Sequence, residues 1–115
     1  MGDLADQRCE ACRAGAPLVT PEEIRGYHPS IPDWEVIEVD GVQRLTRVFS
    51  FRNFAEALDF TNKVGKIAEE EGHHPDIFLA WGKVKLTIFT HTIDGLSEAD
   101  FILAARIDRL ASQRA

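Results

Sequence analysis

The clearest pattern in the chain is an alternation of apolar and other residues along residues 84–91. A period of two residues predicts a strand with one buried face. Residues 77–81 form a second apolar stretch just before it, and Gly82-Lys83 between the two favours a turn. The two stretches therefore predict a β-hairpin whose core face carries Val84, Leu86 and Ile88.

An earlier segment has the same arrangement. Residues 34–39 and 42–51 are rich in apolar and β-branched residues, and Asp40-Gly41 lies between them. An Asp-Gly pair readily adopts the positive φ angles of a two-residue turn, so this segment predicts another β-hairpin.

Between the two hairpins, apolar residues recur every three or four positions and predict a long helix. Asn53, with Glu56 three residues later, resembles a capping box at its start, and Gly72 is suited to end it in the left-handed conformation. The predicted buried stripe of this helix consists of Phe54, Ala57, Leu58, Thr61, Val64 and Ala68.

Two further helices flank the hairpins. Thr20-Pro21-Glu22-Glu23 has the hydroxyl cap, early proline and acidic first turn of a helix start, and Pro29 and Pro32 keep that helix short. Ser97 with Asp100 caps a final helix. Its apolar stripe carries Phe101, Ala104, Ala105, Ile107 and Leu110.

These elements predict an α+β fold with a single domain over residues 20–115, preceded by an N-terminal arm over residues 1–19. The order is helix, two strands, helix, two strands, helix. Because hairpins make antiparallel pairs, we expect one four-stranded antiparallel sheet with the helices packed on one face. A chain of 115 residues is long enough for one such domain and its core.

The composition narrows the classes of function. Thirteen Lys and Arg against nineteen Asp and Glu give a formal net charge of −6, which disfavours binding to nucleic acid and to anionic membrane surfaces. No apolar run approaches the roughly 20 residues of a membrane span. The first residues lack the basic and apolar regions of a secretory signal, so we expect a cytoplasmic protein.

The two cysteines, Cys9 and Cys12, form a C-x-x-C motif in the arm. A structural zinc site needs four ligands, and this pair has neither a second cysteine pair nor two histidines nearby. A thioredoxin-like motif follows a strand, whereas this pair precedes every predicted strand. We expect two reduced thiols, with zinc shared between subunits or a redox role as the alternatives.

Three of the four histidines gather at one place in the predicted sheet. His73 and His74 precede the first strand of the second hairpin, and His91 ends its second strand, so the hairpin brings all three imidazoles to one rim. Glu69, one turn before His73, lies where the helix dipole disfavours an acid, and its carboxylate would stabilise an imidazolium. Imidazoles can donate and accept protons near neutral pH.

Each feature also has an ordinary structural explanation. Adjacent histidines after a helix are as often solvated loop residues, and Trp34 and Trp81 are more often core anchors than ligand platforms. A three-histidine metal site is a further alternative, although adjacent histidines chelate one metal with difficulty and no carboxylate lies as an obvious fourth ligand. The convergence of three histidines is what favours a functional site.

The pattern Glu69-x3-His73-His74-Pro75-x5-Trp81-x9-His91-x8-Asp100 resembles the signature of the pterin-4a-carbinolamine dehydratases. The Pro-Asp-Trp segment that ends at Trp34 and the Gly-Leu-Ser segment before Asp100 are also similar to that family. The Cys9–Cys12 arm is similar to bacterial members that accompany phenylalanine hydroxylase. The resemblance extends over about residues 9–110.

The resemblance implies dehydration of 4a-hydroxytetrahydrobiopterin to quinonoid dihydrobiopterin and water, which recycles the pterin cofactor of an aromatic amino acid hydroxylase. It implies no metal and no cofactor in the enzyme itself. It makes His73 and His91 general acids on the two faces of the pterin, and His74 a ring-binding residue and candidate base. Glu69 and Asp100 would then orient or charge the imidazoles.

The other site residues that the resemblance implies are Gly72, Pro75, Trp34, Trp81, Thr90 and Thr92, with the two tryptophans as pocket walls. Two positions depart from the family. Gly72 stands where many members have Asp, and Ile77 stands where an aromatic residue is common. The first departure removes a possible partner of His73.

A catalytically silent binding or regulatory module is the alternative function, since mammalian relatives serve as dimerisation cofactors of a homeodomain transcription factor. Loss of catalysis would leave nothing to require all three histidines, so the sequence favours the enzyme. Family members assemble as dimers and tetramers, and the predicted sheet has two exposed edges. We therefore expect a homodimer or homotetramer.

Overall fold

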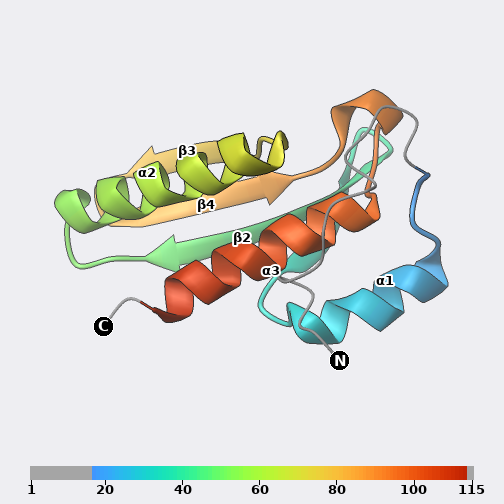
Figure 1. Cartoon of the computed structure of the whole chain (residues 1–115), viewed down its shortest axis with the longest axis horizontal. Helices are drawn as coiled ribbons and strands as arrows, with labels where there is room; N and C mark the ends of the chain where they lie inside the picture. Colours follow the sequence, from blue (N-terminus) through green and yellow to red (C-terminus); the bar gives the residue numbers. More distant parts are fainter. Residues whose placement is uncertain (1–16, 114–115) are drawn as a thin grey trace.

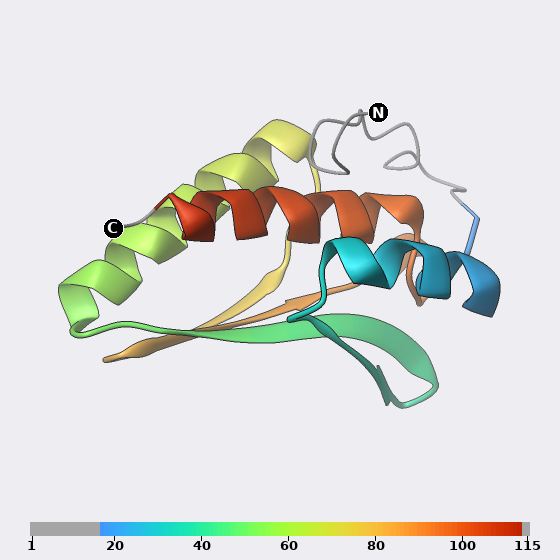
Figure 2. The same ribbon diagram turned by 90° about the horizontal axis from the view of Figure 1, so that it is seen from below.

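The computed structural model describes residues 17–113, in which three α-helices lie against one antiparallel sheet (Figure 1). The strands are ordered β1-β2-β4-β3 across the sheet. Their bounds are β1 Glu35–Val39, β2 Val42–Ser50, β3 Asp76–Ala80 and β4 Lys83–Ile88. The helices are α1 Pro21–Tyr27, α2 Phe54–Glu71 and α3 Glu98–Ser112. Figure 2 shows all three on the same face of the sheet, so the predicted α+β fold is confirmed.

The helices begin where the sequence predicts. At α1, the amide of Glu23 donates to Thr20 Oγ1 at 3.1 Å and the amide of Thr20 donates to Glu23 Oε1 at 2.9 Å. At α2, the amide of Glu56 donates to Asn53 Oδ1 at 2.9 Å. These bonds satisfy amides that have no partner within the first turn of a helix.

The end of α2 sets the direction in which the chain leaves toward the histidines. Gly72 has φ 63° and ψ 28°, the left-handed conformation predicted for it. The amide of His73 donates to the carbonyl of Ala68 at 3.1 Å, and that of Gly72 donates to Glu69 at 3.3 Å. This is the Schellman arrangement, which turns the chain sharply back from the helix axis.

The first hairpin has the predicted turn, and the second differs by one residue. Asp40 and Gly41 have φ of 54° and 78°. In the second hairpin Ala80 pairs with Lys83, so the turn is Trp81-Gly82, one residue earlier than expected. There Gly82 lies close to the end of β2, whose next residue, Phe51, donates its amide to the Gly82 carbonyl at 2.8 Å. A Cβ on Gly82 would lie 3.2 Å from the carbonyl oxygen of Phe51.

The core lies between the sheet and the helices. The predicted core face of β4 is confirmed, since each of its three residues is fully buried: Val84, Leu86 and Ile88. On α3, the residues Phe101, Ala104 and Ile107 are also buried as predicted.

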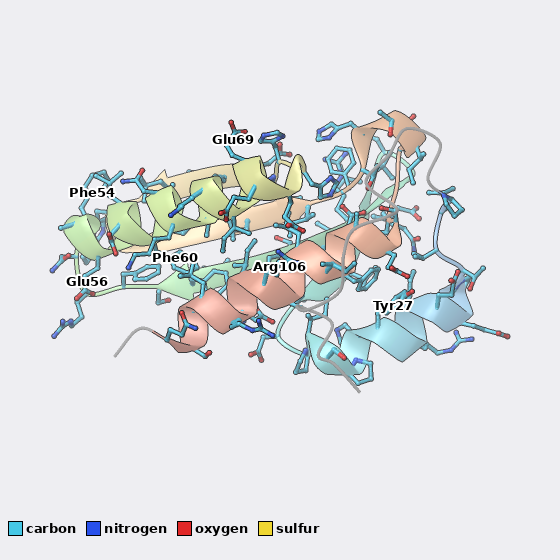
Figure 3. The ribbon with its side chains drawn as sticks, in the orientation of Figure 1. Tyr27, Phe54, Glu56, Phe60, Glu69 and Arg106 are labelled. Carbon is cyan, nitrogen blue, oxygen red and sulfur yellow. The ribbon has the colours of Figure 1, made fainter. Side chains whose placement is uncertain are left out.

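The buried stripe of α2 is rotated from the predicted one. Phe54 and Leu58 are 48% and 40% exposed, whereas Phe60 is buried. Phe60 packs against Phe49 and Phe51, with ring centroids 4.8 and 5.1 Å away. Figure 3 shows Phe60 on the side of α2 nearer α3. The rotation arises because α2 packs on α3 as well as on β3 and β4.

The last residues of the predicted arm run beside the loop before α3. The amide of Val19 donates to the carbonyl of Leu96 at 2.9 Å. The rest of the arm, including Cys9 and Cys12, lies outside the described residues. No helix between residues 17 and 113 has the length and apolar character needed to cross a bilayer.

Candidate functional site

A buried carboxylate joins the segments that carry the histidines. Asp100, in the first turn of α3, is fully buried. Its Oδ1 lies 2.5 Å from Nε2 of His73, and its Oδ2 accepts from Thr90 Oγ1 at 2.8 Å and from the amide of Ser97 at 2.7 Å. Because Thr90 directly precedes His91, Asp100 fixes the end of α2, the chain after β4 and the start of α3 together.

The contact with Asp100 decides which nitrogen of His73 is free. An ionised carboxylate only accepts hydrogen bonds, so Nε2 of His73 donates to it. Within the described residues, no hydrogen bond is made to Nδ1. That nitrogen is therefore the one that can give a proton to a ligand, or take one from it.

His74 contacts a carboxylate in a different setting. Its Nε2 lies within hydrogen-bond distance of Oε2 of Glu69, and both side chains are exposed. Figure 3 shows Glu69 near the end of α2, on the side away from α3. The acid that the sequence placed near the histidines thus contacts His74, while His73 contacts Asp100.

A second acid at the end of α2 has a structural partner. Arg106 of α3 donates from Nη1 to Glu71 Oε2 at 2.8 Å, and both side chains are partly buried. Figure 3 places Arg106 on α3. This ion pair holds the end of α2 against α3, which keeps His73 within reach of Asp100. Acids placed against the helix dipole are thereby compensated by neighbouring groups.

His91 is held differently from the other two histidines. The sequence predicts that it ends β4, but β4 ends at Ile88, and His91 begins a short 3-10 helix, His91–Ile93. The chain turns away from the sheet there, with the amide of Thr90 donating to Gly95 at 2.8 Å. The His91 imidazole lies 4.1 Å from the ring centroid of Phe89.

The strand register shows that the histidine segments meet at one end of the second hairpin. Asp76, the first residue of β3, pairs with Thr87 near the end of β4. Pro75, which is partly buried, directly precedes β3, so His74 and Thr90 leave the hairpin at the same end. Thr92 lies in the 3-10 helix and is exposed, as is Gly72 at the end of α2.

The two tryptophans do not join this cluster. Trp34 is 1% exposed, and its Nε1 donates to Asp108 of α3 at 2.7 Å, so its ring belongs to the core. Trp81 lies in the turn at the other end of β3, roughly 16 Å along the strand at about 3.3 Å per residue. It is 72% exposed. The pocket-wall role that the resemblance implies for both tryptophans stays a prediction.

The arrangement does not resemble a metal site. Within residues 17–113, no group of three or more His, Cys, Asp and Glu side chains is placed to hold a metal ion. Each histidine of the cluster instead has its own partner, a buried carboxylate, an exposed carboxylate or an aromatic ring. Imidazoles held by such partners can transfer protons to a bound ligand.

Comparison with known proteins identifies the family. The family profile described as "Pterin 4 alpha carbinolamine dehydratase" matches residues 17–110. A protein of Syntrophotalea carbinolica that bears this family's name is 57% identical over 110 residues, which are 96% of this chain and 98% of that protein. The chain belongs to the pterin-4-alpha-carbinolamine dehydratase family. A member from Nitrosococcus oceani is 58% identical and covers 96% of this chain and 97% of its own.

Solved structures of the dehydratase family share the fold. A transcriptional coactivator/pterin dehydratase from Brucella melitensis superposes with a TM-score of 0.74 at 30% identity, covering 83% of this chain and 99% of its own. A pterin dehydratase-like protein identified as a RuBisCO assembly factor in the alpha-carboxysome has a TM-score of 0.60 at 28% identity, covering 71% and 93%. One fold therefore accompanies different described roles, and the function depends on the residues of the site.

Proposed function

We propose that this protein dehydrates 4a-hydroxytetrahydrobiopterin to quinonoid dihydrobiopterin and water in the cytoplasm, and so recycles the pterin cofactor of an aromatic amino acid hydroxylase. The observation that carries the proposal is the arrangement at Asp100. One buried carboxylate holds Nε2 of His73, leaves Nδ1 of that ring for a ligand, and fixes the segment that leads to His91. Membership of the dehydratase family supports the choice of reaction.

The reaction needs an acid and a base. The bond between C4a and the hydroxyl oxygen breaks, and a proton is lost from the adjacent ring nitrogen. Hydroxide is a poor leaving group, so a general acid that protonates it contributes about 10²–10⁴-fold. In the proposal His73 and His91 supply that proton on opposite faces of the ring, and His74 binds the ring and accepts the proton from nitrogen. The products are the quinonoid dihydropterin and one water molecule, so no metal and no cofactor is required.

The chain has features that suit a homodimer or homotetramer. The strands β1 and β3 are the two edges of the sheet, and an unpaired edge favours pairing with another chain. Large apolar side chains are exposed near β3 and α2, among them Phe78, Trp81 and Phe54. A monomeric mass in sedimentation at micromolar concentration would exclude this assembly.

A binding or regulatory module is the second candidate function. It is favoured by the described roles of the two structural neighbours, a transcriptional coactivator/pterin dehydratase and a RuBisCO assembly factor. Such a role would depend on the surface of the protein and would not require the three histidines.

The histidine variants separate the two candidates. The His73→Ala and His91→Ala proteins should each lose about 10²-fold or more in turnover of chemically generated 4a-hydroxytetrahydropterin, unequally for the two 4a stereoisomers. The double variant should lose far more than either one, and His74→Ala should weaken binding as well as turnover.

The matched control is His28→Gln, because Nε2 of His28 contacts the carbonyl of Trp34 and a glutamine can still donate there. This variant should keep the parent turnover. Parent rates in all three alanine variants would reject the dehydratase site and leave the binding module.

A further inference from the structure

His91 lacks the kind of support that the other two histidines have. His73 and His74 each contact a carboxylate, whereas no hydrogen bond is made to the His91 imidazole within the described residues. Its contact is with the ring of Phe89, at an interplanar angle of 38°. An exposed side chain without such a bond exchanges between rotamers, and a general acid needs a defined position.

Phe89 is a buried member of the hydrophobic core cluster, and a cation lies beside its ring. The alternation along residues 84–91 predicts that Phe89 faces away from the core, yet it is only 9% exposed and directly follows β4. Leu45 pairs with Ile88 in the core, so Arg44, the neighbour of Leu45 along β2, faces the side of the sheet that no helix covers (Figure 2). There the guanidinium carbon of Arg44 lies 4.3 Å from the ring centroid of Phe89.

The position of Arg44 is not explained by an acidic partner. Within residues 17–113 its side chain has no ion pair, and its Nε is buried without a hydrogen-bond partner. Arg47 differs from Arg44 in this respect. Its guanidinium carbon also lies over an aromatic ring, 4.2 Å from the ring centroid of Phe49, but its Nη1 donates to Oδ1 of Asp108 at 2.6 Å. A buried donor without a partner is unfavourable, so the stack on Phe89 is the contact that holds Arg44 in place.

We infer that Arg44 is a positioning residue for His91. Its planar guanidinium holds the Phe89 ring, and that ring in turn holds the His91 imidazole in one orientation toward the ligand. Arginine suits this task because its flat, weakly hydrated cation stacks on an aromatic ring, whereas a lysine ammonium is a compact, strongly hydrated point charge. The effect of Arg44 on turnover rests on the proposed function, but its effect on the orientation of His91 does not.

Nuclear magnetic resonance of the histidine rings tests the orientation without any substrate. Next to the Phe89 ring, the carbon-bound protons of His91 should resonate away from the position of a freely rotating histidine. In Arg44→Ala and in Phe89→Leu they should move toward that position, and Arg44→Lys should restore them only in part. The resonances of His73 and His74 should stay in place, which also shows that each variant is folded.

Turnover supplies the second readout. Arg44→Ala should lower kcat by about tenfold or more on the stereoisomer that depends on His91, with little change for the other stereoisomer or in KM. Lys85→Ala, on the same open face of the sheet, is the matched control and should leave both rates unchanged.

The two readouts separate the positioning role of Arg44 from the proposed dehydratase function. If the His91 resonance moves in Arg44→Ala but the parent protein does not speed dehydration, the proposed function fails and the positioning role stands. If Arg44→Ala leaves that resonance in place, the positioning role is wrong, even where Phe89→Leu moves it, because the leucine removes the ring that shifts the resonance.

Discussion

Two aspartates of α3, Asp100 and Asp108, lie about two turns apart and have opposite kinds of partners. Asp108 accepts from Nε1 of Trp34 at 2.7 Å and from Nη1 of Arg47 at 2.6 Å, both on Oδ1. These donors join the start of β1 and the middle of β2 to α3. An arginine is always charged, so this carboxylate keeps a cation beside it at every pH at which the protein folds.

Asp100 has no permanent cation among the partners described for it. Its donors are a hydroxyl, a backbone amide and the imidazole of His73. The same residue type on the same helix therefore contacts an arginine at one end of α3 and a histidine of the candidate site at the other. The two aspartates therefore differ in the groups that donate hydrogen bonds to them, and not in burial alone.

The largest expected effect comes from changing each aspartate to asparagine. In Asp100→Asn the amide replaces one acceptor oxygen with a donor, so His73 loses the partner that fixes its proton on Nε2, and turnover should fall by about 10²-fold or more. Asp108→Asn should keep the parent turnover per folded molecule. Dehydration rates, normalised to the folded fraction from circular dichroism, measure both. Equal losses in the two variants would erase the proposed difference between the two ends of α3.

The next largest effect concerns the stability that the contacts of Asp108 give to the protein. Trp34→Phe removes the indole donor and part of a fully buried side chain, and should lower the free energy of unfolding by about 1–3 kcal/mol. Urea unfolding measures this loss. Turnover per folded molecule should not change, because Trp34 lies in the core. Parent stability with reduced turnover would instead assign Trp34 to the ligand pocket.

Asp108 should also make stability depend on pH. Burial raises the pKa of its carboxyl above the ordinary 3.8, although the hydrogen bond from Trp34 and the charge of Arg47 lower it. The folded state then holds the proton more tightly than the unfolded chain does. The stabilisation is complete below pH 3.8 and is lost as pH rises through the higher pKa of the folded state.

The Asp108→Asn variant should lack this pH-dependent part of the free energy of unfolding, because an asparagine does not titrate. Urea unfolding of both proteins across the acidic range measures the difference in their free energies of unfolding. A difference that is flat across this range, or one that favours the parent as pH rises, would show that burial does not dominate at Asp108.

The smallest effect concerns Tyr27, the one tyrosine in the sequence. Burial, followed by the hydrogen bond it donates to Glu98 at 2.9 Å, raises the pKa of Tyr27 to about 12. Ultraviolet absorbance of the phenolate should therefore titrate near that pH in the folded protein. Glu98→Gln should lower the midpoint without bringing it to 10, because the burial remains. A midpoint at the ordinary value in the parent would mean that this side chain is not held against α3.

The parts of the fold that could be predicted rest on neighbouring residues. The caps at Thr20 and Asn53, the turn at Asp40-Gly41 and the left-handed Gly72 each depend on a few adjacent side chains. The meeting of the histidine segments could also be predicted, because an antiparallel hairpin brings its two open ends together whatever surrounds it.

The parts that could not be predicted depend on how distant elements pack. Periodicity gave α2 an apolar stripe but not its rotation toward α3, so Phe60 was missed and Phe54 was misplaced. The pairing of β2 with β4 has no local signal, and only that pairing brings Arg44 to Phe89. A tryptophan likewise gives no sign in the sequence of whether it faces a ligand or, as Trp34 does, a buried carboxylate.

The most direct test is the rate at which 4a-hydroxytetrahydropterin disappears in the presence of much less protein than substrate. The parent protein should increase this rate in proportion to its concentration, over many turnovers, with quinonoid dihydropterin as the product. The double variant His73→Ala/His91→Ala should return the rate to that of the spontaneous reaction. A spontaneous rate that the parent protein leaves unchanged would contradict the dehydratase assignment at the Asp100 end of α3.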